Sequence, residues 1–315
     1  KGDRARCPVC GEKENKISAK AGKEKMDKCA LTASSCICSR GCPSTWGCNA
    51  TSLCNNTLTL AANYSAPKVP ARATFLLSLI FNRSHVRNVF ANHPERAYNR
   101  ELNRILWFVS SARKVSTKLP IHVMVAGDRE RKGEDKLKQQ DVGIVTASII
   151  PPPRWASKWH KLSFSKIAAL SLVQFDLIIV MDNDMALIHN VDELALVTPP
   201  AAVFHRAAGR VARQSPAAIT TGLMILQPSL SEFHRAKVHL ASLNYSDARY
   251  DGGDEEFWHH FYPVYQELPT AYHAHLLLSM NTSNWLKVKA IHCISAFAGR
   301  GWHVPKSVHR HMKYY

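Results

Sequence analysis

The chain has 315 residues, 46% of them hydrophobic, and carries a formal net charge of +17. This apolar content is enough for a core and excludes the intrinsically disordered class for most of the chain, while no apolar run approaches the roughly 20 residues of a membrane-spanning helix. The 41 basic and 24 acidic side chains are interleaved, so we interpret the charge first as a general surface property and second as a footprint for a polyanionic partner.

Residues 1–66 form a separate Cys-rich region. Eight of the nine cysteines lie there, in sequence too poor in apolar residues to build a core of its own. An even number of cysteines in such a segment predicts disulfides in an oxidising compartment. A zinc site is the alternative, because Cys7 and Cys10 have a zinc-ribbon spacing, although the other cysteines do not repeat it.

Glycosylation sequons favour disulfides over zinc. Six N-x-S/T sequences begin at Asn49, Asn55, Asn63, Asn82, Asn244 and Asn281, and the first three lie beside the cysteines. We therefore expect the protein in the Golgi or another secretory-pathway lumen, with secretion as the second choice. The chain begins at Lys1 without Met, which leaves room for a membrane anchor upstream.

Residues 67–73 are predicted to be a stiff, proline-containing linker, and residues 74–315 a second domain. Its apolar patterns predict strands at 74–81, 121–125, 144–149, 177–181, 203–205 and 223–226. They predict helices at 98–112, at 164–174 and, after the capping box of Ser229 and Glu232, up to Leu243. This alternation predicts an α/β fold whose central sheet is mostly parallel and covered on both faces.

The central stretch of this domain is residues 175–194, FDLIIVMDNDMALIHNVDEL. Its five apolar residues 177–181 indicate a buried strand, and Asp182, Asn183 and Asp184 follow at the strand's exit, where open α/β sheets bind ligands. The two carboxylates point the same way, about 6–7 Å apart, and suit Mn²⁺ or Mg²⁺. A plain solvated turn is the alternative interpretation.

This stretch resembles the metal-binding segment of glycosyltransferase family 8, the glycogenin-like retaining enzymes, and the likeness continues over about residues 74–302. The resemblance implies a single GT-A-type, Rossmann-like domain that binds a UDP-sugar with Mn²⁺ (or Mg²⁺). Lys166, sixteen residues before Asp182, matches the family's donor-contacting lysine. We assign it to the donor site and to catalysis, because a cation there stabilises the leaving diphosphate.

Two glycine-containing segments match the family's donor-binding motifs. Residues 219–229 resemble "fNsGvmvlqPs", which places Thr221 and Gly222 against the donor; Thr220 replaces the family's Asn. Residues 251–254 resemble "DGGDQ", which frames the donor sugar. This likeness assigns Gly253, Asp254 and Glu255 to the donor site, with Asp254 catalytic and Glu255 in place of Gln.

The C-terminal part supplies the last candidates. Residues 268–273 resemble "LPf.YN", and residues 290–293 resemble "vvHf", whose His completes the metal site; His292 is therefore the third predicted ligand beside Asp182 and Asp184. The family's KPW is absent, and Arg300, with Trp302, is the nearest substitute for its phosphate contact. Tyr98 is a candidate for stacking on the nucleotide.

The resulting hypothesis is a retaining transferase that moves a hexose or related sugar from a UDP-sugar to a glycan or glycoprotein. Residues 276–289 contain no Tyr, so self-glucosylation in the manner of glycogenin is not expected. The alternatives are an inactive, glycan-binding family member and a zinc-containing, basic nucleic-acid binder; we expect no nucleic-acid partner. A homodimer is compatible with the sequence.

Overall fold

A computed structural model describes residues 68–85, 93–157, 160–205, 218–243, 253–274 and 286–292. The chain divides into two units, Lys1–Pro67 and Lys68–Tyr315. The first unit lies outside the described residues, so the predicted disulfides, the zinc alternative and the sequons at 49, 55 and 63 stay predictions. Among the described helices, none combines the length and apolar character needed to cross a bilayer.

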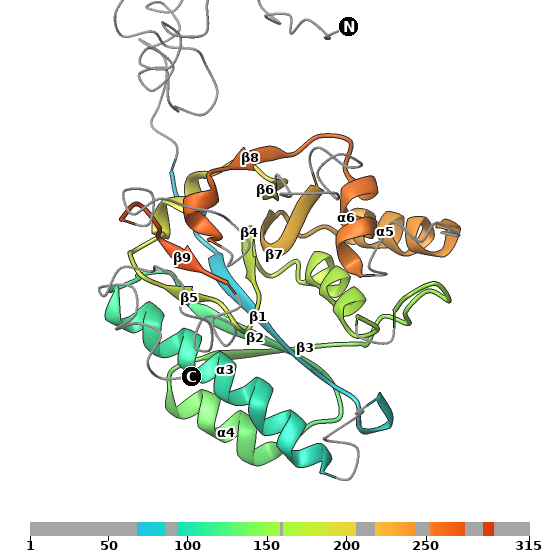
Figure 1. The fold of residues 1–315 in the computed structure, drawn as a ribbon, viewed down its shortest axis with the longest axis horizontal. Coiled ribbons are helices and arrows are strands. Elements are labelled where there is room, and N and C mark those ends of the chain that lie inside the picture. Colours follow the sequence, from blue (N-terminus) through green and yellow to red (C-terminus); the bar gives the residue numbers. More distant parts are fainter. Residues whose placement is uncertain are drawn as a thin grey trace, which may run out of the picture. The chain divides into compact units, whose positions relative to one another are not determined.

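The second unit is built on a seven-stranded sheet in the order β3-β2-β1-β4-β7-β6-β8 (Figure 1). The strands are β1 (Ala73–Phe81), β2 (Ile121–Gly127), β3 (Gly143–Ala147), β4 (Leu177–Met181), β6 (Ala201–His205), β7 (Ala218–Leu226) and β8 (Gln266–Leu268). All neighbouring pairs are parallel except those of β7, which runs antiparallel to β4 and β6. The predicted mostly parallel α/β sheet is confirmed.

Alternating side chains of each strand enter two separate cores, as the two-residue period of a strand requires. On β1, Phe75 and Leu77 contribute to one core and Leu76 to the other. The first core is covered by α3 (Pro94–Lys114) and α4 (Arg131–Gln139). The second is covered by the 3₁₀ helix η4 (Ser163–Ser171), α5 (Leu230–Ser242) and α6 (Asp254–Phe261).

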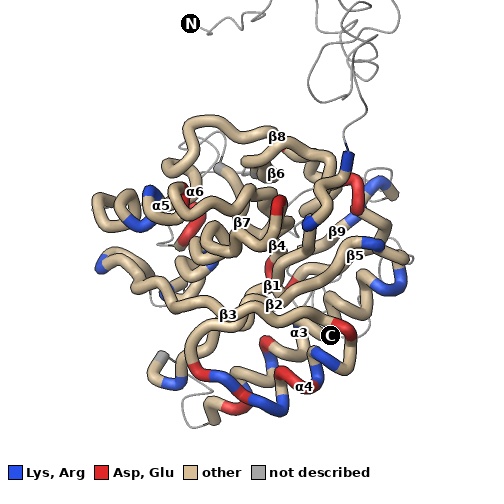
Figure 2. The backbone as a smooth tube through the Cα atoms, turned by 180° about the vertical axis from the view of Figure 1, so that it is seen from behind, with Lys and Arg blue, Asp and Glu red and all other residues tan. Residues whose placement is uncertain are grey.

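Several described elements differ from the predictions. The helix predicted at 164–174 is a 3₁₀ helix that spans residues 163–171, and helix α6 was not predicted. Helix α4 was not predicted, because Leu137 is its only large apolar residue; Figure 2 shows basic and acidic positions side by side along it. Tyr98 is a core residue, only 3% exposed and packed edge-on against Phe81, so it is not available to stack on a nucleotide.

A second, small sheet carries the end of the described chain. The two-residue strands β5 (Ala186–Leu187) and β9 (Ala290–Ile291) pair antiparallel, near the short helices η5 (Asp192–Leu196) and η7 (Thr270–Tyr272). Glu193 of η5 accepts a hydrogen bond of 2.9 Å from the Tyr272 hydroxyl and pairs with Lys289. These contacts attach β9, and therefore His292 directly after it, to the domain. The remaining short helix, η2 (Arg83–His85), follows β1.

Candidate active site

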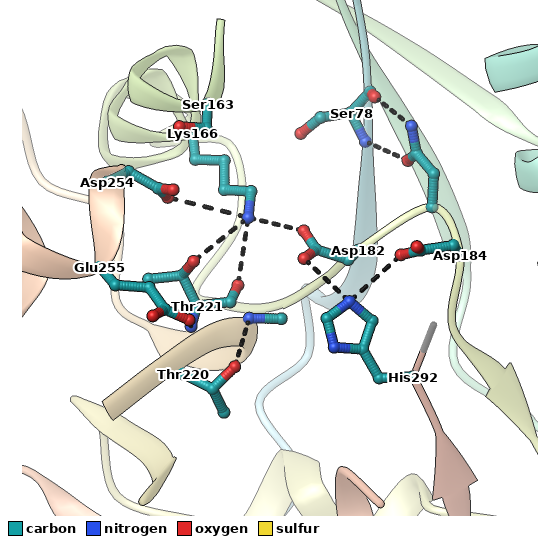
Figure 3. Close-up of polar contacts among 12 residues, drawn as sticks. Ser78, Ser163, Lys166, Asp182, Asp184, Thr220, Thr221, Asp254, Glu255 and His292 are labelled. Atoms are coloured by element: carbon teal, nitrogen blue, oxygen red, sulfur yellow. Dashed lines mark hydrogen bonds and ion pairs between the residues drawn. The ribbon is translucent and has the colours of Figure 1, made fainter. Parts of the chain in front are cut away.

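The metal-ligand candidates begin where β4 ends, beside the middle of β7 (Figure 3). The Asp182 backbone N–H donates to the Gly222 carbonyl at 3.0 Å, so the chain leaves the sheet only after this residue. Side chains from η4, α6 and the segment after β9 converge on the same place. The candidate site is therefore at the carboxyl end of a buried, central strand, as the sequence predicts.

Asn183 fastens this exit to the neighbouring strand. Its side-chain amide donates to the Ser78 carbonyl at 2.8 Å and accepts from the Ser78 N–H at 3.3 Å. Because the β1–β4 ladder ends at Leu76 and Val180, the amide takes the place of the next peptide group. The sequence assigned Asn183, with Asp182 and Asp184, to the donor site; that assignment stays a prediction, and the structure gives the Asn183 side chain two backbone partners in β1.

We expect Asn183→Ala to lower the free energy of unfolding by about 1–3 kcal/mol, because both Ser78 backbone groups lose their partner. Chemical denaturation of the two proteins measures this difference. Asn103→Ala, at an exposed position of α3, is the matched control and should change stability by less than about 0.5 kcal/mol. An equally small effect at Asn183 would contradict the fastening role.

Lys166 lies between two carboxylates. Its Nζ is 2.6 Å from Asp182 Oδ1 and 3.7 Å from Asp254 Oδ2, and it donates to the Thr221 carbonyl at 3.3 Å. Burial by itself would lower the pKa of Lys166, but the two carboxylates outweigh it and raise that pKa. Burial likewise opposes ionisation of Asp182, yet Lys166 and His292 hold the pKa of Asp182 well below its usual range. Both groups are therefore charged at neutral pH.

Asp182, Asp184 and His292 form a cluster able to hold a metal ion. One ligand atom from each lies within 4.8 Å of the others. His292 Nε2 is 3.2 Å from Asp184 Oδ1 and 3.5 Å from Asp182 Oδ2. Burial by itself would raise the pKa of Asp184, but His292 more than offsets burial and lowers that pKa below its usual value. Two carboxylate oxygens and one imidazole nitrogen are a donor set that suits Mn²⁺, so the residues fit the predicted ion.

The first turn of α6 faces the same site. Asp254 is its first residue, 4% exposed, and Glu255 Oε1 accepts from the Thr221 N–H at 3.4 Å. Gly253 is the N-cap residue. Burial raises the pKa of Asp254, and nearby Lys166 only partly opposes this. The Asp254 carboxyl group is therefore more easily protonated than the carboxyl group of Asp182.

This raised pKa predicts a pH-dependent effect of Asp254→Asn. A group whose folded-state pKa is raised stabilises the fold fully below its unfolded pKa of about 3.9, and that contribution is lost as pH rises through the folded pKa. Asparagine does not ionise. In metal-free protein, the stability of Asp254→Asn relative to wild type should therefore increase with pH above about 4. Thermal unfolding over pH 4–8 measures it, and a pH-independent difference would contradict the burial argument.

Gly222 lies against two histidine side chains, and its predicted contact with the donor stays a prediction. A Cβ there would lie 2.2 Å from His273 Nε2 and 3.2 Å from His292 Cε1. The sequence predicted a close approach at Gly222 but attributed it to the donor. It also missed His273, whose only signal was that it stands where the family's "LPf.YN" has Asn. Arg300 and Trp302 lie outside the described residues, and their predicted phosphate contact stays a prediction.

The assembled site lies at the carboxyl end of the central strand β4. It combines the buried Lys166, the cluster of Asp182, Asp184 and His292, and the buried carboxyl group of Asp254. This combination can hold a divalent cation beside a cationic side chain, and so can bind and polarise a diphosphate. The class of protein that the fold and the site together indicate is an α/β enzyme.

Comparison with known proteins narrows the class. Residues 98–196, which include Lys166 and the Asp182–Asp184 segment, match the family model "Mannosyltransferase putative". An uncharacterized protein of Acanthamoeba polyphaga mimivirus is 31% identical over an alignment of 100 positions, which covers 28% of this chain and 35% of the viral protein. The family model thus supports the predicted class, a glycosyltransferase.

Two solved structures are similar at low sequence identity. The bifunctional glycosyltransferase WbbM, in its apo form, matches with a TM-score of 0.49 and 11% identity, over 79% of this chain and 53% of WbbM. The glycosyltransferase GlyE of Streptococcus pneumoniae matches with a TM-score of 0.48 and 11% identity, over 70% of this chain and 55% of GlyE. The chain therefore spans only about half the length of either protein.

Proposed function

We propose that this protein is a metal-assisted glycosyltransferase that takes a hexosyl group from a nucleotide diphosphate sugar. The observation that carries the proposal is the meeting, at one strand exit, of side chains that four separate segments supply: Lys166, Asp182, Asp184, Asp254 and His292. A glycan-binding but inactive protein would not need a buried lysine held between two carboxylates. This arrangement supports an enzyme over that alternative.

Cleavage of a sugar–diphosphate bond is difficult because negative charge develops on the leaving β-phosphate. A metal ion held by Asp182, Asp184 and His292 would supply positive charge for the phosphate oxygens. Lys166 adds a second positive charge, and its partners Asp182 and Asp254 fix its Nζ so that no reorganisation is needed. Asp254 is placed on the opposite side of Lys166 from the metal cluster, where it can orient a sugar hydroxyl or stabilise positive charge at the anomeric carbon.

The donor and the stereochemistry are the finer parts of the proposal. The family 8 likeness of the segment around Asp182 favours a UDP-sugar, a GT-A-type donor site and transfer with retention. The description of the matched family model favours a mannosyl group. A hexosyl group is compatible with the family 8 likeness and with the matched family model. The predicted acceptor is a glycan or glycoprotein in the secretory pathway, which is consistent with the sequons, of which only Asn82 lies in the described part of the chain.

The proposal is tested by incubating the purified protein with UDP-glucose, UDP-galactose, UDP-N-acetylglucosamine and GDP-mannose, each with Mn²⁺ or with EDTA. We expect Mn²⁺-dependent release of the nucleoside diphosphate from one donor, and product with the donor's anomeric configuration by NMR. If no donor is hydrolysed and none binds in calorimetry with Mn²⁺ present, the proposal is wrong. Binding without hydrolysis or transfer to any acceptor would identify the inactive alternative.

A further inference from the structure

A second histidine lies behind the metal-ligand cluster. His273 follows η7, is fully buried, and stacks obliquely on His292 with ring centroids 4.5 Å apart and an interplanar angle of 50°. His273 Nε2 is also 3.4 Å from the Thr220 hydroxyl of β7. His273 therefore contacts a candidate ligand without belonging to the cluster itself.

Backbone contacts bring the two histidine segments into register. The Ala274 N–H donates to the Ala290 carbonyl at 3.0 Å, and the His292 N–H donates to the Ala274 carbonyl at 2.9 Å. Ala274 and Ile291 accordingly form an isolated parallel bridge. The segment that carries His273 and the segment that carries His292 are thus hydrogen-bonded to each other through their backbones.

Gly222 and Thr220 of β7 form the surface against which His273 packs, with His292 also beside Gly222; we call these two residues the socket. The absence of a side chain at Gly222 makes room for His273 Nε2 and His292 Cε1 at once. Thr220, 1% exposed, accepts from the Gly222 N–H at 3.3 Å and so lies against the same space. In the family 8 pattern, Asn stands at both positions, 220 and 273; here the two replacements touch each other.

We propose that His273 is a positioning residue of the metal site, which holds the His292 ring so that its Nε2 faces Asp182 and Asp184. The proposal rests on the proposed function, since it assumes that the cluster binds a metal. An imidazole turns about a broad, two-fold torsion, and only packing or a hydrogen bond restricts it. Groups outside the ligand set that orient a metal-bound histidine, usually through a hydrogen bond, typically contribute 10–100-fold to metal affinity.

The test is Mn²⁺ binding by calorimetry, without any donor. Leucine at position 273 keeps the volume and removes the nitrogen atoms, while glutamine keeps a nitrogen near the position of Nε2. We expect His273→Leu to raise the Mn²⁺ dissociation constant about 10–100-fold, and His273→Gln to recover part of the loss. Equal Mn²⁺ affinity of wild type and His273→Leu would overturn the proposal.

A matched control separates positioning from general destabilisation. His122 of β2 also contacts a threonine, Thr74, with its Nδ1 at 2.8 Å from the hydroxyl, but it lies at the amino end of the sheet. His122→Leu should lower the unfolding temperature and leave the Mn²⁺ affinity unchanged. If His122→Leu weakened Mn²⁺ binding as much as His273→Leu, the positioning role would be refuted. If wild type bound no Mn²⁺, the metal-dependent part of the proposed function would fail first.

Discussion

Asp184→Asn should reduce turnover of the donor sugar by at least about 10³-fold, a change of about 4 kcal/mol in the activation free energy. The substitution keeps the size of the side chain and removes its charge. Asp184 Oδ1 is the cluster oxygen nearest to His292 Nε2, at 3.2 Å, and Asp184 lies farther along the exit than Asp182. Its loss leaves one carboxylate and one imidazole, a pair that holds Mn²⁺ far more weakly. Nucleoside diphosphate release at a fixed Mn²⁺ concentration that just saturates the wild type measures the effect.

Asp141→Asn is the matched control for this experiment. Asp141 lies on the surface after α4 with a positive φ of 52°, a conformation that asparagine also adopts. Its variant should keep wild-type turnover. If Asp184→Asn retained more than about a tenth of wild-type activity, the DxD residue would not be a metal ligand in catalysis and the proposed site would be wrong.

Lys166→Met should affect activity and metal affinity in opposite directions. Turnover should fall about 10²–10³-fold, because the leaving group loses a preorganised cation. The Mn²⁺ affinity should rise, because Lys166 no longer competes with the ion for Asp182, whose Oδ1 lies 2.6 Å from Nζ. Without metal, the fold should lose up to about 3–5 kcal/mol, since the partly buried Asp182 and the buried Asp254 are left with no cation between them.

Calorimetry, turnover and denaturation on one protein sample check these three effects together. Lys136→Met, on the exposed face of α4, is the control and should change none of them. Weaker Mn²⁺ binding by Lys166→Met would show that Lys166 supports the metal site rather than competing with it. Unchanged turnover would remove Lys166 from the catalytic machinery.

The parts of the fold that the sequence predicted are those whose signal is local. Residues 177–181 form the buried strand β4 with the predicted bounds, because five consecutive apolar residues need protein on both faces. Ser229 caps α5 through its contact with the Glu232 N–H, as the capping box indicates. The strand and the cap each depend on a few neighbouring side chains, so no tertiary information was needed.

The parts that were missed depend on distant residues. Nothing in the pattern of residues 218–226 shows that β7 runs antiparallel, since the period of a strand is the same in both directions. Helix α6 was hidden because DGGD is also a good turn. The contact of Thr220 with His273 joins residues 53 positions apart, and only the folded chain reveals that these two departures from the family pattern touch each other.

His292 is attached to the domain through the short strand β9 and not through the seven-stranded sheet. The two ladder residues of β5, the bridge between Ala274 and Ile291 and the contacts of Glu193 hold this segment, and we expect so small a set of contacts to open at a lower free energy than the large sheet. If His292 is a metal ligand as proposed, it can bind the ion only while this segment is docked, and the metal affinity is then the intrinsic affinity multiplied by the docked fraction. We therefore expect a substitution at Glu193 that loosens the segment to lower the Mn²⁺ affinity while leaving Asp182, Asp184 and His292 themselves unchanged.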